Sequence, residues 1–131
     1  MSKEPKKGEL LSPLEKLVEK TMADATAKAD ELSKKINKNV YPLVFVRSEK
    51  EIFVGFIQEP TRAAKMEAFD VMSAKESMTM AGEVIVSTSL MKEESHEAFY
   101  SKDSKYDDVY MSACVDSLGH VKALMNVLKK K

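Results

Sequence analysis

Apolar residues recur every three or four positions over residues 14–36, and this spacing places them on one face of a helix. Ser12 is followed by Pro13 and, three positions after the serine, by Glu15, which is the composition of a capping box with a proline in the first turn. We therefore predict a long N-terminal helix within residues 12–38. Its apolar stripe is narrow and consists of Leu14, Leu17, Val18, Met22, Ala25, Ala29, Leu32 and Ile36.

Residues 40–47 and 52–57 are rich in β-branched and aromatic side chains, and a short polar segment separates them. This pattern predicts a β-hairpin. Pro42 has no backbone N–H to donate, so the first strand begins there or lies at an edge, and Gly55 indicates a bulge. Because an isolated hairpin is only marginally stable, it must pack on helices or gain strands from another copy.

Three further helices are predicted over residues 61–75, 78–91 and 107–128, with a polar, acidic surface loop over residues 92–106. The β-branched run Val84–Thr88 leaves a strand as an alternative in the middle of the second of these helices. The buried stripe expected for the last helix is Tyr110, Cys114, Leu118, Val121, Met125 and Leu128. The fold class is therefore α+β and mostly helical: a long N-terminal helix, a β-hairpin, then three helices.

The segments divide the chain into a lysine-rich flexible tail (residues 1–11), the N-terminal helix (12–38) and a hairpin-plus-helices domain (39–131). The narrow stripe leaves two arrangements open for the N-terminal helix. It packs on its own domain, or it pairs with another helix, including one from a second copy.

Charge and composition limit the partners and the location. The chain has 131 residues with 21 basic and 21 acidic side chains, so it lacks the basic excess that a nucleic-acid partner usually requires. A zero net charge also permits homo-oligomers. No signal peptide and no membrane-spanning run of about 18 apolar residues is apparent, so we expect a cytoplasmic protein with no membrane partner. One cysteine excludes an intrachain disulfide.

Residues that carry out catalysis or bind metals are sparse. His96 and His120 have no zinc-ligand spacing, and the acidic segment Glu93–Glu97 lacks a calcium-loop pattern. Cys114 and His120 are separated by roughly 9 Å of helix rise and point in different directions, so the histidine is poorly placed to activate the thiol. The glycines are too far apart to form a phosphate-binding loop. We therefore expect no catalytic residues, no cofactor, no metal, and a function other than catalysis.

Methionine is abundant, with nine residues, and its flexible side chain suits adaptable binding surfaces as well as ordinary cores. We expect a protein partner to dock in an exposed apolar groove between helices. The candidate partner-binding residues are Met66, Met72, Met78, Met80 and Met91.

The order of several short motifs resembles that of the small tail assembly chaperones of tailed phages and prophages. The motifs are the strand end Phe56–Arg62, the helix segment Ala81–Val86, Ser89–Met91, the acidic loop Glu93–Glu97, and a last helix with Ser112–Ala113 and a lysine-rich end. The resemblance covers about residues 40–131. It implies a chaperone without catalytic residues that binds the tape measure protein during tail assembly, keeps it soluble, recruits tail subunits and is absent from the finished particle.

Two features of the chain bear on this resemblance. The long helix over residues 12–37 departs from the compact family pattern. The family often extends its C-terminus by ribosomal frameshifting, and Lys129–Lys131 suits either a slippery adenine run or a simple helix end. The alternative functions are a virion or neck structural component that oligomerises through the long helix, a small enzyme or ligand-binding domain, and a nucleic-acid accessory protein.

Overall fold

The structure is a computed structural model that describes residues 12–129, with side chains described as far as His120. Helix α2 (Pro13–Ile36) begins at the predicted capping box. The Ser12 hydroxyl accepts the Glu15 N–H at 3.1 Å, and the Glu15 carboxylate accepts the Ser12 N–H at 2.8 Å. Asn37 ends the helix in the left-handed conformation, with φ 59°, which asparagine tolerates better than most residues.

Strands β1 (Val40–Ser48) and β2 (Glu51–Gln58) form an antiparallel hairpin in which Leu43 lies opposite Gly55. The register is irregular between Val46 and Ser48, so the bulge expected at Gly55 is wrong. Gly55 instead makes room for an aromatic ring. A Cβ atom there would lie 2.8 Å from Cδ2 of Phe99.

The two edges of the hairpin differ. On the β2 side, the Met91 N–H donates to the Phe56 carbonyl at 2.8 Å, and the Phe56 N–H donates to the Ser95 hydroxyl at 2.9 Å. The backbone groups of Phe56 thus point away from β1. Its partner Pro42 therefore points its own backbone away from β2. Pro42 lies on an edge strand as predicted, because its missing N–H removes no bond from the ladder.

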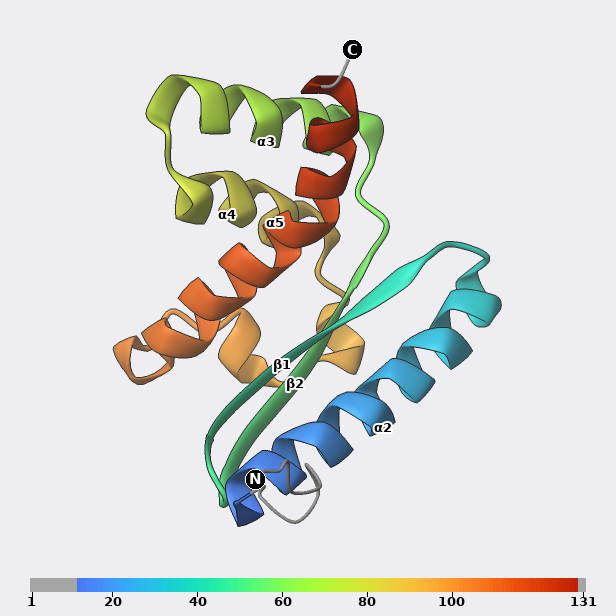
Figure 1. Cartoon of the computed structure of the whole chain (residues 1–131), viewed down its shortest axis with the longest axis vertical. Helices are drawn as coiled ribbons and strands as arrows, with labels where there is room; N and C mark the ends of the chain where they lie inside the picture. The colour runs from blue at the N-terminus through green and yellow to red at the C-terminus, as the bar shows by residue number, and fades with distance from the viewer. Residues whose placement is uncertain (1–11, 130–131) are drawn as a thin grey trace, which may run out of the picture.

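The hairpin separates two layers of helix (Figure 1). Because successive side chains of a strand point to opposite faces, Leu43, Phe53 and Ile57 enter the core formed with the C-terminal helices. Val40 and Phe56 pack on the other face, against Ala29 and Leu32 of α2. The long helix therefore packs on its own chain.

Only part of the α2 stripe is buried. Ala25, Ala29 and Leu32 are buried, but Leu14, Val18 and Met22, nearer the N-terminus of the helix, keep 37%, 36% and 41% of their surface exposed. The stripe was predicted correctly as a face. Its N-terminal apolar side chains, however, are exposed, whereas Leu32 and Ile36 near the C-terminal end pack against the hairpin.

The remaining elements follow the predicted order. They are α3 (Arg62–Lys75), α4 (Met78–Ser89), three short 3₁₀ turns (Lys92–Glu94, Glu97–Phe99, Ser104–Tyr106) and α5 (Asp107–Lys129). The protein is thus a mostly helical α+β fold with the order helix, hairpin, three helices. The alternative of a strand over Val84–Thr88 is wrong, because that run lies inside α4, where Ile85 and Val86 enter the core.

Residues 92–106 are only in part the polar surface loop that we predicted. Ala98 and Phe99 are completely buried, and the Phe99 ring occupies the space above Gly55. The His96 Nδ1 atom accepts the Ala98 N–H at 2.9 Å, which holds the turn that directs Phe99 inward. A pair of apolar residues in a polar segment has no periodicity, so the pattern of residues could not reveal this contribution to the core.

Candidate functional site: a groove between two helices

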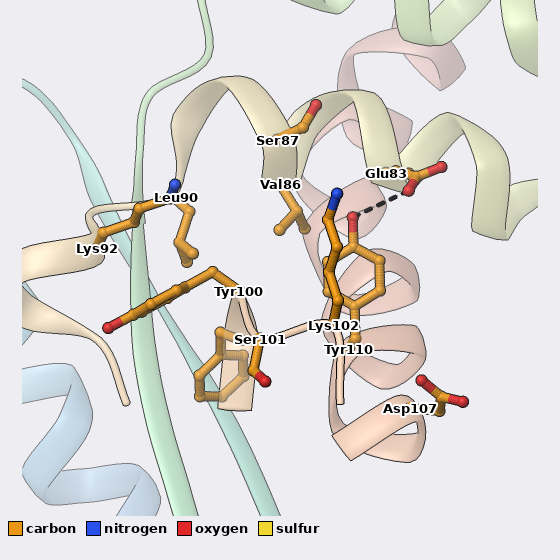
Figure 2. A pocket seen from close by; sticks show the side chains of 11 residues that line it. Glu83, Val86, Ser87, Leu90, Lys92, Tyr100, Ser101, Lys102, Asp107 and Tyr110 are labelled. Atoms are coloured by element: carbon orange, nitrogen blue, oxygen red, sulfur yellow. Dashed lines mark hydrogen bonds between the residues drawn. The ribbon is translucent and has the colours of Figure 1, made fainter. Parts of the chain in front are cut away.

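A cavity of about 440 Å³ opens between the C-terminal half of α4, the start of α5 and the segment that joins them (Figure 2). Its volume lies within the usual range for binding pockets, roughly 300–1,000 Å³. We call this cavity the α4–α5 groove. It is lined by Glu83, Val86, Ser87, Leu90, Lys92, Phe99, Tyr100, Ser101, Lys102, Asp107 and Tyr110.

The floor of the groove is apolar. Val86 and Phe99 are part of the protein core, and Leu90 packs against that core from the end of α4. Tyr100 lies beside them at the opening, where 41% of its surface is exposed. Since the floor is built from core residues, it is held in shape before any partner arrives.

One wall of the groove carries a hydrogen-bonded pair. The Tyr110 hydroxyl of α5 donates to the Glu83 carboxylate of α4 at 3.1 Å (Figure 2). Burial raises the pKa of Tyr110, and the nearby Glu83 carboxylate raises it further. Tyr110 therefore remains a neutral hydrogen-bond donor at any physiological pH. Its hydroxyl contacts the Glu83 carboxylate, which is the acidic side chain of α4 that lines the groove.

Two lysines stand at the opening. The Lys92 ammonium lies 5.6 Å from the centre of the Tyr100 ring, a cation–π distance. In Figure 2 the Lys92 and Lys102 side chains rise from the connecting segment toward α4. Within the part of the chain that the structure describes, neither lysine forms an ion pair.

The Cys114 and His120 side chains do not form a catalytic pair. Cys114 is buried as predicted, and burial together with the negative charge of Glu83 raises the pKa of its thiol to about 11. His120 stacks on Tyr41 instead, with ring centroids 3.9 Å apart. Partial burial against that ring lowers the pKa of His120.

Neither a metal-binding cluster nor a membrane-spanning helix is found among the residues that the structure describes. No group of three or more His, Cys, Asp and Glu side chains in that part of the chain could hold a metal ion. None of its helices is both long and apolar enough to cross a membrane.

The five methionines predicted to contact a partner do not gather in one place. Met66 on α3 and Met78 and Met80 on α4 are exposed, with 60%, 37% and 47% of their surface accessible. Met72 packs against the main core, and Met91 packs against the α2–hairpin cluster beside a second hollow of about 350 Å³. None of the five lines the α4–α5 groove, so their role in binding stays a prediction.

The apolar groove between helices was predicted, but its residues were not. Tyr100 and Lys102 come from the segment predicted to be a polar, acidic surface loop, and Lys92 follows the end of α4. Only the aromatic pair Phe99–Tyr100, set within a polar run, could have pointed to this segment.

The chain matches no protein-family model, and neither a curated protein nor a solved structure matches it. Indications of function therefore come from the geometry of the groove, the exposed apolar side chains and the order of the sequence motifs.

Proposed function

We propose that this protein is a non-enzymatic tail assembly chaperone of a phage or prophage, which binds the tape measure protein and tail subunits in the host cytoplasm. The observation that carries the proposal is the α4–α5 groove: an apolar floor of core residues, open to solvent and large enough for one big side chain of a partner. The resemblance in the order of the motifs over residues 40–131 is the reason for proposing this family.

The size of the groove sets the strength of binding. Burying one Phe- or Leu-sized side chain contributes roughly 1.5–3 kcal/mol, whereas even a millimolar complex requires about 4 kcal/mol. A partner held by this groove alone therefore dissociates readily. Weak, repeated contacts suit a chaperone that keeps a long apolar-rich protein soluble and leaves before the particle is complete.

Exposed apolar side chains elsewhere extend the surface available to a long partner. Met66 and Phe69 lie on the outer face of α3, and Met111 and Val115 lie exposed on α5. Soluble proteins usually keep contiguous apolar patches small, and patches at binding sites are larger. Several weak sites along one partner raise the overall affinity without a single tight contact.

A second function is favoured by a different observation. Leu14, Val18 and Met22 form an exposed stripe on α2, which suits pairing with a second copy or with a neighbouring subunit. On that basis the chain is an oligomeric structural component of the virion or neck. Such a component stays in the purified particle, whereas a chaperone is absent from it.

The test is co-expression of the full chain with the tape measure protein encoded in the same genome, followed by measurement of the soluble fraction of that protein. We expect this chain to raise the soluble fraction and to co-purify with the tape measure protein. Recovery of the chain as a permanent part of purified particles would instead support the structural component. No change in solubility and no co-purification would contradict the chaperone.

A matched pair of substitutions ties the result to the groove. Ser87 is exposed and lines the groove, so Ser87→Trp places a large ring in the opening. The next residue, Thr88, is also exposed but does not line the groove. We expect Ser87→Trp to reduce the soluble tape measure protein and Thr88→Trp to leave it near the wild-type level.

A further inference from the structure

The charged side chains around the α4–α5 groove differ in whether they already contact another side chain. Lys92 and Lys102 form no ion pair within the described residues, and both stand at the opening. Glu83 already accepts a hydrogen bond from Tyr110. The groove therefore presents two cations that form no ion pair, and two carboxylates, of which Glu83 accepts a hydrogen bond from the neutral Tyr110 hydroxyl but keeps its charge.

The other carboxylate is placed differently. Asp107 is the first residue of α5, where the positive end of the helix dipole stabilises a negative charge. In Figure 2 its side chain lies apart from Tyr100 and Leu90, beyond Tyr110, whereas the Lys92 and Lys102 side chains rise beside Leu90 and Val86. The two ammonium groups thus lie next to apolar residues of the floor, and Asp107 lies apart from them.

Lys92 also contacts an aromatic ring at the edge of the groove. Its ammonium lies over the face of the Tyr100 ring, at 5.6 Å from the ring centre, so its charge is held close to the exposed apolar edge of the groove. A carboxylate that follows or precedes an inserted side chain would meet this cation with little rearrangement. A basic residue in the same place would meet two like charges.

We propose that the α4–α5 groove selects protein segments in which a large apolar side chain stands next to acidic residues. The inserted side chain covers Val86, Leu90 and Phe99, and the adjacent carboxylates pair with Lys92 and Lys102. This inference rests on the proposed function, in that it assumes the groove binds protein segments, and it adds the chemistry by which one segment is chosen over another.

The experiment uses the full chain and four synthetic 15-residue peptides that differ only around the central position. Three carry a central Phe flanked by Glu, by Gln or by Lys, and the fourth carries a central Ala flanked by Glu. Binding is measured by NMR titration at low ionic strength, which detects complexes of millimolar and weaker affinity. We expect the Glu-flanked Phe peptide to bind about fivefold more tightly than the Gln-flanked one, the scale of one or two exposed ion pairs. The Lys-flanked peptide should bind more weakly than both.

Charge reversal provides the sharper test. In the double variant Lys92→Glu and Lys102→Glu, the order should invert, so that the Lys-flanked peptide binds best. The milder pair Lys92→Gln and Lys102→Gln should abolish the preference for the Glu-flanked over the Gln-flanked Phe peptide, because the paired cations are gone while Glu83 and Asp107 remain. The control reverses Lys50 and Lys75, which are exposed and do not line the groove, and it should keep the wild-type order.

The possible failures are distinguishable. Equal binding of the Glu-, Gln- and Lys-flanked Phe peptides to the wild-type chain overturns the acidic preference but leaves an apolar groove that binds protein segments. A preference that is lost equally in the Lys50 and Lys75 control overturns it as well, since net charge would then be the cause. If no Phe peptide binds better than the Ala peptide, both this inference and groove binding are wrong.

Discussion

Gly82 of α4 lies directly against the backbone of Cys114 on α5. A Cβ atom built on Gly82 would come within 1.8 Å of the Cys114 carbonyl oxygen and 2.4 Å of its carbonyl carbon. The two helices can therefore approach this closely only because position 82 has no side chain. The α4–α5 groove depends on this contact, since its two walls are the helices that the glycine brings together.

Gly82→Ala should destabilise the protein, because the new methyl group meets rigid backbone and the helices must separate. We expect a loss of about 2 kcal/mol in the free energy of unfolding, despite the better helix propensity of alanine. Gly119 is the control, since a Cβ there meets nothing within 4 Å and Gly119→Ala should add up to about 1 kcal/mol. Urea denaturation of both variants tests the pair. Equal effects of the same sign would contradict the close contact.

The ion pair between Arg47 and Asp108 should make the free energy of unfolding depend on pH in the acidic range. The guanidinium donates from Nε to Asp108 at 3.0 Å and from a terminal nitrogen at 2.8 Å, which joins β1 to the first turn of α5. The hydrogen bonds from Arg47 hold the pKa of Asp108 below its ordinary value. The stabilisation is thus fully present above the unfolded pKa, about 4, and is lost as the pH falls through the lower folded value.

The wild-type protein should therefore lose stability as the pH falls below about 4, and Asp108→Asn should flatten that part of the profile. Thermal melts from pH 7 to pH 2 provide the measurement. Asp70→Asn is the control, because this exposed carboxylate forms no ion pair in the described residues. An acid dependence that survives unchanged in Asp108→Asn would mean that other carboxylates cause it.

Cys114 should react slowly with thiol reagents in the folded protein. Its pKa of about 11 leaves roughly one thiolate in a thousand at pH 8, and its side chain is completely buried. We expect modification by a disulfide reagent to proceed at the rate of unfolding and to become fast in urea. Rapid modification without denaturant would show that the thiol is accessible, which is contrary to the structure.

Ser117→Ala should stabilise the protein. Ser117 is fully buried on α5, and its hydroxyl has no hydrogen-bond partner among the described residues. Removing an unpaired buried hydroxyl at nearly constant volume should gain about 1 kcal/mol. Ser89 is also buried, but its hydroxyl lies 3.2 Å from that of Thr88, so Ser89→Ala should give no such gain. Denaturant midpoints for the two variants test the difference, and similar midpoint shifts would count against it.

The sequence by itself determined the elements, because their signals are local. The hydrogen bonds of the capping box join residues three apart, so Ser12 and Glu15 mark the start of α2 without any tertiary contact. The left-handed stop at Asn37, the two strands and the helices α3 and α5 are also short-range consequences of residue type and spacing, whereas the β-branched run Val84–Thr88 left α4 open until the structure was known. The same reasoning correctly placed Cys114 on a buried face and Pro42 on an edge strand.

Only the tertiary structure decided which apolar faces are covered and where the groove lies. The Phe99 ring could not be assigned to the core until the space above Gly55 was known. The contact between Gly82 and the Cys114 backbone also brings together α4 and α5, which are separated by the segment of residues 90–106. The periodicity of α2 likewise marks a face that includes both buried Leu32 and exposed Val18. The physical reason is common to all three: periodicity reports the direction of a side chain, whereas burial depends on which distant segment fills the space opposite it.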